Sequence, residues 1–233
     1  MSGDADVAGA AALIGEPARA AFLLALTEAD ALPAQALAER ARVAPSTASA
    51  HLARLHAAGL IAAERRGRHR YFRLARPEVA AVLEALAVIA PARPVHSLRE
   101  ASAGEALRLA RTCYDHVAGR LGVELAAALE RERVVIHSNG GYALGRVAPS
   151  RLSSLGIDLE PLERRRRALV RSCLDWSERR PHLAGALGAA LAERLFALGW
   201  VERRSANRSL AVTDAGWQGL RSELGIDVDA MVR

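Results

Sequence analysis

The stretch PAQALAERARVAPSTASAHLARLHAAGLIAAERRGRHRYFRL, residues 33–74, decides the fold of the first part of this chain. Proline suits the first turn of a helix, and glycine suits the position just after a helix ends, so Pro33 and Gly59 mark helix ends. The predicted order is a helix over 34–41, a helix over 46–58, a strand over 60–63, a charged turn over 64–70 and a strand over 71–74. This is the order of a helix-turn-helix followed by a β-hairpin wing.

The helix over 46–58 is expected to present one face to the core and another to a partner. Ala48, Leu52 and Leu55 follow one another at i, i+4 and i+7, so they share an apolar face. The remaining positions carry small hydroxyl groups near the start of the helix and basic groups further along. Such side chains contact base edges and phosphates when a helix lies in the major groove. The DNA-contacting residues expected on this helix are Ser46, Thr47, Ser49, His51 and Arg54.

Positive charge is concentrated around the predicted wing. The whole chain carries a net charge of +6, but residues 40–76 contain nine arginines and one acid, a local net charge of +8. Arginines at one tip repel each other unless an anion lies nearby, and DNA phosphates are suitable anions. The alternative is that the run is only a solvated surface. We expect double-stranded DNA as the partner, with wing contacts from Arg65, Arg66, Arg68 and Arg70.

Residues 8–90 resemble the winged helix of the ArsR family of bacterial transcriptional regulators. The motifs that carry the resemblance are S-x-H-L at 49–52, L-x-x-A-G-L at 55–60 and R-G-R-x-x-Y at 66–71. The resemblance implies a homodimer joined through the helices at about 8–29 and 77–90. It also implies a repressor that a signal releases from its operator, and it places the residues named above against DNA.

The sequence departs from this family at the positions where its metal sensors bind metal. Those sensors often carry a Cys-x-Cys-type cluster in the helix before the recognition helix, or His, Asp and Glu on the last dimer helix. Here residues 34–41 contain no cysteine, and residues 77–90 offer Glu78 and Glu84 without His or Asp. A sensing function is therefore expected in the second half of the chain.

Prolines and polar residues at 91–104 mark a domain boundary. We assign residues 1–92 to a DNA-binding and dimerisation domain and residues 93–233 to a regulatory or sensing region. An internal repeat organises this region. The motif pairs, at offsets of 60, 66 and 69 residues, are RTCYD (111–115) with RSCLD (171–175), HVAGRLG (116–122) with HLAGALG (182–188), and LGID (155–158) with LGID (224–227).

The two copies, at about 105–160 and 161–233, are each expected to run helix, second helix, short strands and final helix. We interpret each copy as a degenerate winged helix. The predicted fold class is therefore mainly α with small β-hairpin wings (α+β), a winged helix-turn-helix followed by two weaker copies of a related shape.

The repeated motifs also contain the candidate ligand-binding residues. Cys113 and His116 are spaced i, i+3 and are expected to share a helix face, and Cys173 and His182 are the equivalent pair. If the copies pack about a pseudo-twofold axis, the pairs could converge, and cysteine with histidine suits zinc or another soft metal. The alternative is that they are merely buried, with no cofactor. The candidate pocket residues are Cys113, His116, Cys173, Asp175, Trp176, Arg179 and His182.

The same polar residues have a structural interpretation, in which Asp175, Arg179 and their neighbours cap helix ends and form ion pairs inside the fold. Enzymatic activity is not expected, because the chain has neither a G-x-S-x-G nucleophile motif nor a lysine for a phosphate-binding loop. Neither a membrane-spanning run nor a secretory signal is apparent, and two cysteines do not form a disulfide-rich scaffold. A cytoplasmic location is therefore expected.

The sequence predicts a sequence-specific DNA-binding transcriptional regulator, most simply a homodimeric repressor released by an unidentified small-molecule or metal effector. Two alternatives stay open. One is a metal- or thiol-responsive sensor that uses Cys113, His116, Cys173 and His182. The other is a non-catalytic module that uses its winged helices for protein contacts.

Overall fold

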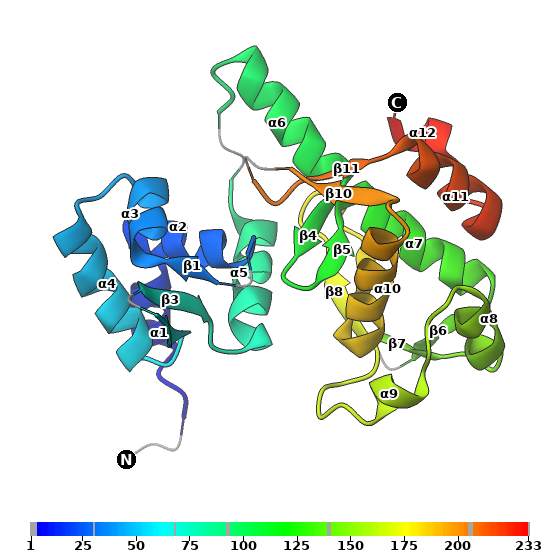
Figure 1. Ribbon diagram of the computed structural model, residues 1–233, viewed down its shortest axis with the longest axis horizontal. Coiled ribbons are helices and arrows are strands. Elements are labelled where there is room, and N and C mark those ends of the chain that lie inside the picture. The colour runs from blue at the N-terminus through cyan, green and yellow to red at the C-terminus, as the bar shows by residue number, and fades with distance from the viewer. Residues whose placement is uncertain are drawn as a thin grey trace. The chain divides into compact units, whose positions relative to one another are not determined.

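The computed structural model describes residues 4–29, 31–67, 69–91, 94–138, 141–204 and 207–232. The chain divides into two compact units between Leu83 and Glu84. Each unit is described by itself below, with the labels of Figure 1. The domain boundary expected at 92/93 falls on residues outside the described ranges and stays a prediction.

The first unit is a winged helix-turn-helix. Its elements are α1 (Val7–Ile14), α2 (Pro17–Leu26), β1 (Leu32–Pro33), α3 (Ala34–Ala41), α4 (Pro45–Ala57), β2 (Ile61–Arg66), β3 (His69–Leu74) and the start of α5 (Pro77–Ile89). Helices α2, α3 and α4 pack on one another (Figure 1). Their shared core is made of fully buried side chains, which include Phe22, Leu23, Leu37, Leu52 and Leu55.

The helix ends follow the local sequence. Gly59, directly after α4, has φ 68°, a left-handed conformation that glycine adopts without steric cost. The turn between α3 and α4 also needs a left-handed residue, and Arg42 supplies it with φ 54°. The helices predicted over 34–41 and 46–58 correspond to α3 and α4, within one residue at each end.

The wing differs from its prediction in length. Strands β2 and β3 pair antiparallel from Ile61↔Leu74 out to Arg66↔His69, and β1 adds a third strand in the order β1-β3-β2. The expected charged turn over 64–70 is therefore wrong, because most of that segment is paired strand. The burial pattern explains the difference, since the outer ends of both strands are exposed and Arg65, Arg66 and Arg70 reach solvent from paired strand.

The helical segment expected at about 8–29 is broken between α1 and α2, where Gly15 and Pro17 lie. Glu16 caps α2, and its carboxylate accepts hydrogen bonds from the backbone N–H groups of Ala18 at 3.1 Å and Arg19 at 2.9 Å. Burial alone would raise the pKa of Glu16, but these bonds and the nearby basic side chains outweigh it and lower the pKa.

Glu16→Ala is expected to lower the free energy of unfolding by about 1 kcal/mol at neutral pH, the usual value of a side-chain cap. A carboxyl whose folded-state pKa is lowered stabilises the fold above its unfolded pKa of about 4.3 and loses this contribution as pH falls through the folded value. Urea unfolding of both proteins at pH 7 and near pH 3 measures this. The difference should shrink at the lower pH, and an unchanged difference would contradict the role of the carboxylate.

The second unit contains α6 (Leu98–Leu109), β4 (Arg111–Cys113), β5 (His116–Ala118), α7 (Gly119–Arg131), β6 (Val135–Ser138), β7 (Gly141–Leu144), α8 (Ala148–Ser154), α9 (Glu160–Glu163), β8 (Arg171–Leu174), β9 (Pro181–Ala184), α10 (Gly185–Ala197), β10 (Val201–Arg203), β11 (Leu210–Val212), α11 (Asp214–Leu224) and α12 (Val228–Val232). Its described strands form four two-stranded antiparallel hairpins. The order hairpin, helix, hairpin, helix occurs twice, first from β4 to α8 and again from β8 to α11. The expected order of helix, second helix, short strands and final helix is wrong in one respect, because a hairpin stands between the first and second helices of each copy. That these copies are degenerate winged helices stays a prediction.

The two copies interlock. Helix α7 of the first copy packs on β9 of the second, helix α10 of the second packs on β5 of the first, and β5 contacts β9. A single apolar core runs through both copies and includes Leu121 and Leu129 of α7 and Leu187 and Leu191 of α10. The hairpins β4–β5 and β8–β9 are thereby fixed beside one another at the centre of this unit.

The position of the cysteine–histidine pairs corrects the sequence prediction. Cys113 and His116 do not share a helix face, because they face each other across the hairpin β4–β5. Cys173 and His182 occupy the same register in β8–β9. An i, i+3 spacing fits a tight hairpin as well as a helix, and Tyr114 adopts the positive φ of 60° that such a turn requires.

Among the described residues, no single helix is both long and apolar enough to cross a bilayer, and only α1 and α2 taken together, with an 85° bend between them, meet that length and composition.

Candidate nucleic-acid interface and cysteine–histidine cluster

Helix α4 presents the hydroxyl and arginine side chains that the sequence assigns to DNA contact. Ser46, Thr47 and Arg54 are exposed, on the side of the helix away from the buried stripe of Ala48 and Leu52. Ser49 is also exposed, but its hydroxyl donates to the carbonyl oxygen of Pro45 at 2.9 Å. The start of α4 therefore offers free hydroxyl groups within one turn of its N-terminus, where the helix dipole favours phosphate.

His51 does not belong to this exposed face. Its Nδ1 lies 3.4 Å from Arg19 Nη1 and 3.4 Å from Glu16 Oε2, and its ring meets the edge of Phe22 at 6.3 Å between ring centroids. The physical reason is its position, three residues after the buried Ala48, which places it at the edge of the apolar stripe. The geometry gives His51 a role in holding α4 against α2.

The wing carries exposed arginines on both strands. Arg65 donates from Nε to the carbonyl oxygen of Gly67 at 3.3 Å, and Arg66 pairs with Glu64 and lies 5.1 Å from the ring centre of Tyr71. Arg70 is exposed on the returning strand. Arg68, the fourth arginine expected here, lies outside the described residues.

Two arginines near this surface were not singled out from the sequence. Arg42 is exposed in the turn between α3 and α4, and Arg73 is exposed on β3. Both fall within the basic segment 40–76, so the local charge count was the signal that could have found them. They extend the basic surface of the first unit beyond α4 and the wing tip.

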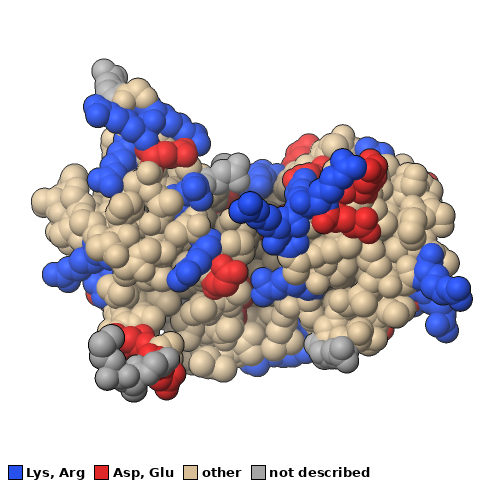
Figure 2. All heavy atoms as spheres, turned by 90° about the horizontal axis from the view of Figure 1, so that it is seen from below, with Lys and Arg blue, Asp and Glu red and all other residues tan. Residues whose placement is uncertain are grey.

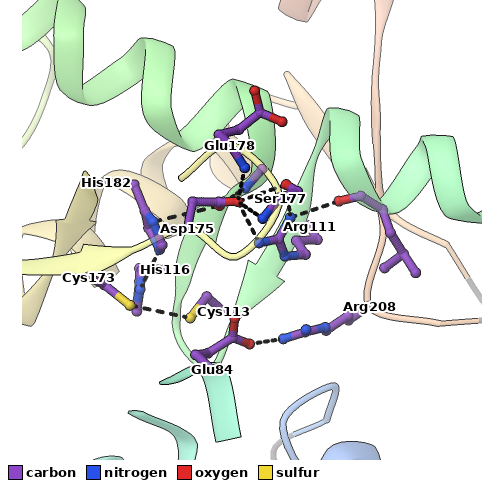
Figure 3. Close-up of polar contacts among 12 residues, drawn as sticks. Glu84, Arg111, Cys113, His116, Cys173, Asp175, Ser177, Glu178, His182 and Arg208 are labelled. Carbon is purple, nitrogen blue, oxygen red and sulfur yellow. Dashed lines mark hydrogen bonds and ion pairs between the residues drawn. The ribbon is translucent and has the colours of Figure 1, made fainter. Parts of the chain in front are cut away.

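The second unit brings Cys113, His116, Cys173 and His182 together (Figure 3). The Sγ atoms of the two cysteines are 3.9 Å apart, and the Nε2 atoms of the two histidines are 3.2 Å apart. All four ligand-type atoms lie within 4.8 Å of one another, and only Cys173 is not fully buried. We call these four residues the Cys–His cluster.

The electrostatics of the Cys–His cluster separate the two cysteines. The hydrogen bond from Cys113, with support from His116 and His182, holds the pKa of the Cys173 thiol far below its usual value. The same hydrogen bond and burial raise the pKa of Cys113. Burial alone would lower the pKa of His116, but its hydrogen bonds to Asp115 and Cys173 outweigh burial and raise it. The arrangement favours a thiolate at Cys173 beside a cationic imidazole.

The other predicted pocket residues divide into two groups. Asp175 is fully buried and pairs with the equally buried Arg111 at 2.9 Å, while Trp176 lies against the Arg111 guanidinium at 4.5 Å. Arg179 does not join them, because it is exposed in the turn of the β8–β9 hairpin with φ 55°. These residues form a buried ion pair that holds the hairpin, in line with the structural interpretation of the sequence.

Arg111 was missed as a site residue. It begins the repeated motif RTCYD, and its counterpart Arg171 begins RSCLD, so the repeat was the available signal. Arg171 is exposed, whereas Arg111 is completely buried. Only the packing of the two copies distinguishes these positions.

Comparison with known proteins places the chain among regulators of transcription. Residues 14–63 match a family model described as a helix-turn-helix domain. Over 223 residues, 96% of this chain and 99% of the relative, the sequence is 39% identical to "Uncharacterized HTH-type transcriptional regulator YdfF" of Bacillus subtilis (strain 168). The chain belongs to the helix-turn-helix transcriptional regulators. Because the likeness spans both units, it covers the second half of the regulator as well as the DNA-binding domain.

Solved structures similar to this regulator match about a third of its length. The transcriptional repressor BigR from Xylella fastidiosa is 23% identical, with a TM-score of 0.35, and the match covers 38% of this chain and 89% of that chain. A homodimeric winged helix-turn-helix DNA-binding domain from Mycobacterium bovis, described as a possible ArsR-family regulator, is 29% identical with a TM-score of 0.31. That match covers 38% of this chain and 89% of that one.

Figure 2 shows one face of the regulator, on which the described arginine side chains do not form a single patch. On the face seen in Figure 2, arginine side chains project at several separate places, with acidic side chains beside some of them. The net charge of +6 therefore does not by itself locate a DNA-binding surface.

Proposed function

We propose that this transcriptional regulator is a homodimeric repressor that binds double-stranded DNA through α4 and the β2–β3 wing. The observation that carries the proposal is the division of α4 into a buried apolar stripe and an exposed side with Ser46, Thr47 and Arg54. This division lets the helix enter the major groove with its first turn toward the bases.

Each part of the interface has a distinct task. Ser46 and Thr47 are close enough to the backbone of α4 to contact base edges or a phosphate, and Arg54 reaches a phosphate or a guanine edge. The wing arginines neutralise the phosphates beside the groove, which adds affinity without sequence preference. Sequence readout is therefore assigned to α4, and salt-dependent affinity to the wing.

Dimerisation is proposed through α1 and α5. Apolar side chains stand exposed on both helices, with 71% of Val7, 44% of Val82 and 78% of Ile89 accessible. Exposed apolar side chains in two helices suit a self-complementary interface, as the ArsR resemblance also implies. A twofold dimer would present two α4 helices to a palindromic operator, about one helical turn of DNA apart.

A second candidate function is a metal- or thiol-responsive regulator whose second unit receives the signal. The convergence of two cysteines and two histidines in that unit favours it. Under this second candidate function, the metal or thiol signal acts on the second unit, while the first unit binds DNA in the cytoplasm.

The wing gives the most direct test of DNA binding. The double substitution Arg65→Ala with Arg70→Ala is expected to weaken binding to every duplex and to reduce the slope of log affinity against log salt by about 3.6, since each phosphate contact contributes about 0.9 and a homodimer loses four. Fluorescence anisotropy with labelled operator and random duplexes, at a series of salt concentrations, measures both quantities. The molar mass of the complex reports whether two chains bind each duplex.

The matched control removes two exposed arginines elsewhere. Arg99→Ala with Arg108→Ala in α6 lowers the net charge by the same amount, and both side chains are exposed. This control should leave the salt slope unchanged. If the wing variant and the control lose equal affinity and slope, the effect is one of net charge alone, and the wing does not contact DNA.

A further inference from the structure

The Cys–His cluster is built from two symmetric halves. Hairpin β4–β5 supplies Cys113 and His116 as directly opposed residues, and hairpin β8–β9 supplies Cys173 and His182 in the same register. Figure 3 shows the four side chains pointing toward a common centre. The cluster therefore joins the two copies of the repeat, and neither hairpin could form it alone.

The distances match the edges of a metal-centred tetrahedron. Zinc lies about 2.3 Å from a cysteine sulfur and about 2.0–2.1 Å from a histidine nitrogen, so a tetrahedral site places two sulfurs about 3.8 Å apart and two nitrogens about 3.3 Å apart. The observed separations are 3.9 Å for the Sγ atoms of Cys113 and Cys173 and 3.2 Å for the Nε2 atoms of His116 and His182. Two of the six edges therefore match a tetrahedral site, and all four ligand atoms lie within 4.8 Å of one another.

The outer faces of both histidines meet carboxylates. Nδ1 of His116 lies 3.2 Å from Asp115 Oδ1, and Asp115 is in turn paired with Arg167. Nδ1 of His182 lies 3.7 Å from Asp175 Oδ2. A carboxylate thus lies behind each imidazole, within hydrogen-bond distance of His116 and at ion-pair distance from His182, and carboxylates in this position are the usual outer shell of zinc-bound histidines.

One buried atom is not accounted for by the packing alone. His182 is completely buried, yet its Nδ1 has no hydrogen-bond partner, while its Nε2 faces the Nε2 of His116. Two imidazole nitrogens in this position can share only one proton. A cation between them would accept both lone pairs and fix a proton on each Nδ1, directed toward its carboxylate.

We propose that Cys113, His116, Cys173 and His182 bind one zinc ion in a closed tetrahedral site that clamps the two copies of the second unit together. Two thiolates neutralise the charge of the ion, so the site is electrically balanced in a buried place. Four protein ligands leave no open position for a substrate, so the role is structural or regulatory rather than catalytic. The proposal concerns the second unit alone and does not depend on DNA binding by the first.

Metal titration of the full chain tests the proposal. The protein is purified under reducing, oxygen-free conditions, any affinity tag is removed, and Co²⁺ is added, followed by Zn²⁺. We expect one equivalent of Co²⁺ per chain, with the visible absorption of tetrahedral cobalt and near-ultraviolet thiolate charge-transfer bands. One equivalent of Zn²⁺ should then abolish both signals.

Variants identify the ligands. Loss of an outer-shell partner weakens metal binding about 10–100-fold, so loss of a ligand in Cys113→Ser or His182→Gln should weaken it more. His137→Gln is the matched control, since His137 is exposed on β6 and pairs with Glu130, and it should bind one equivalent as before. Circular dichroism shows which variants fold. If the ligand variants do not fold, the thiolate charge-transfer bands in the cobalt spectrum of the unaltered chain still show whether cysteine binds the ion.

Three results would overturn the proposal. The first is no stoichiometric uptake of either ion by the reduced chain. The second is uptake without thiolate charge-transfer bands, or equal uptake by the folded ligand variants, because the ion would then lie elsewhere. The third is a Cys113–Cys173 disulfide that reduction reverses without any gain in metal binding, which would make the pair a thiol switch instead.

Discussion

Replacing Asp175 with alanine is expected to lower the free energy of unfolding by about 3–5 kcal/mol, the usual cost of breaking a buried ion pair on one side. Asp175 is fully buried, and its Oδ1 accepts from Nη2 of Arg111 at 2.9 Å (Figure 3). The carboxylate also accepts from the backbone N–H groups of Gly119, Ser177 and Glu178. Its removal leaves a buried guanidinium without a counter-charge and three backbone donors without an acceptor.

The measurement is urea unfolding followed by tryptophan fluorescence, because Trp176, Trp200 and Trp217 all lie in the second unit. The matched control is Asp229→Ala. Asp229 pairs with Arg221 at 2.8 Å, but the two side chains are 75% and 59% exposed, so we expect a loss below about 1 kcal/mol. Equal effects of the two substitutions would show that the Asp175 pair does not organise the fold.

A second substitution separates the ion pair from the backbone contacts. In Arg111→Met the Asp175 carboxylate keeps its three backbone donors, and the methionine can fill the space beside Trp176. We therefore expect Arg111→Met to lower the free energy of unfolding by less than Asp175→Ala does. The double variant should not recover the stability of the original chain, because the backbone donors stay unpaired even when both charges are gone.

The first unit could be predicted from the sequence because its signals are local. Pro33, Gly59 and the apolar spacing of Ala48, Leu52 and Leu55 act within a few residues, and α3 and α4 begin and end within one residue of the prediction. The length of the wing and the inward position of His51 were not predictable in this way. Both depend on what lies opposite, a partner strand in one case and α2 in the other.

The second unit shows the limit of periodicity. The repeated motifs were visible in the sequence. The hairpins that hold the Cys–His cluster were not, because strands of three or four residues contain too few residues to show a period of two. The identity of Arg111 as the buried partner of Asp175 follows from contacts 64 residues apart, which no local pattern contains.

Gly122→Ala and Gly188→Ala are each expected to lower the free energy of unfolding by about 1–3 kcal/mol, although alanine normally favours a helix. These glycines occupy equivalent positions in α7 and α10. A Cβ at Gly122 would lie 2.4 Å from the carbonyl oxygen of Val117, and one at Gly188 would lie 2.5 Å from that of Leu183. The clashing atoms belong to the backbone of the adjacent hairpin, so no side-chain rotation relieves them.

The matched control has the opposite expected sign. Gly104 lies in α6, where the nearest atom to an added Cβ is the Arg108 side chain at 3.8 Å, so Gly104→Ala should stabilise the chain by about 0.5–1 kcal/mol. Urea unfolding of the three variants measures all the differences. A lower free energy of unfolding for the variants at 122 and 188, with a higher one for the variant at 104, would show that each helix must approach its hairpin without a side chain between them. A higher free energy of unfolding for all three variants would mean that the hairpins can move away from α7 and α10 to make room for the added methyl group.

That outcome also bears on the Cys–His cluster. The added Cβ at Gly188 would lie 3.2 Å from Cβ of His116, and the one at Gly122 would lie 3.6 Å from Cβ of His182. Each glycine therefore lets a helix of one copy pack directly behind a histidine of the other copy. Because the two halves of the cluster depend on equivalent glycines, we expect the two substitutions to have effects of similar size, and a large difference would contradict the symmetry of the site.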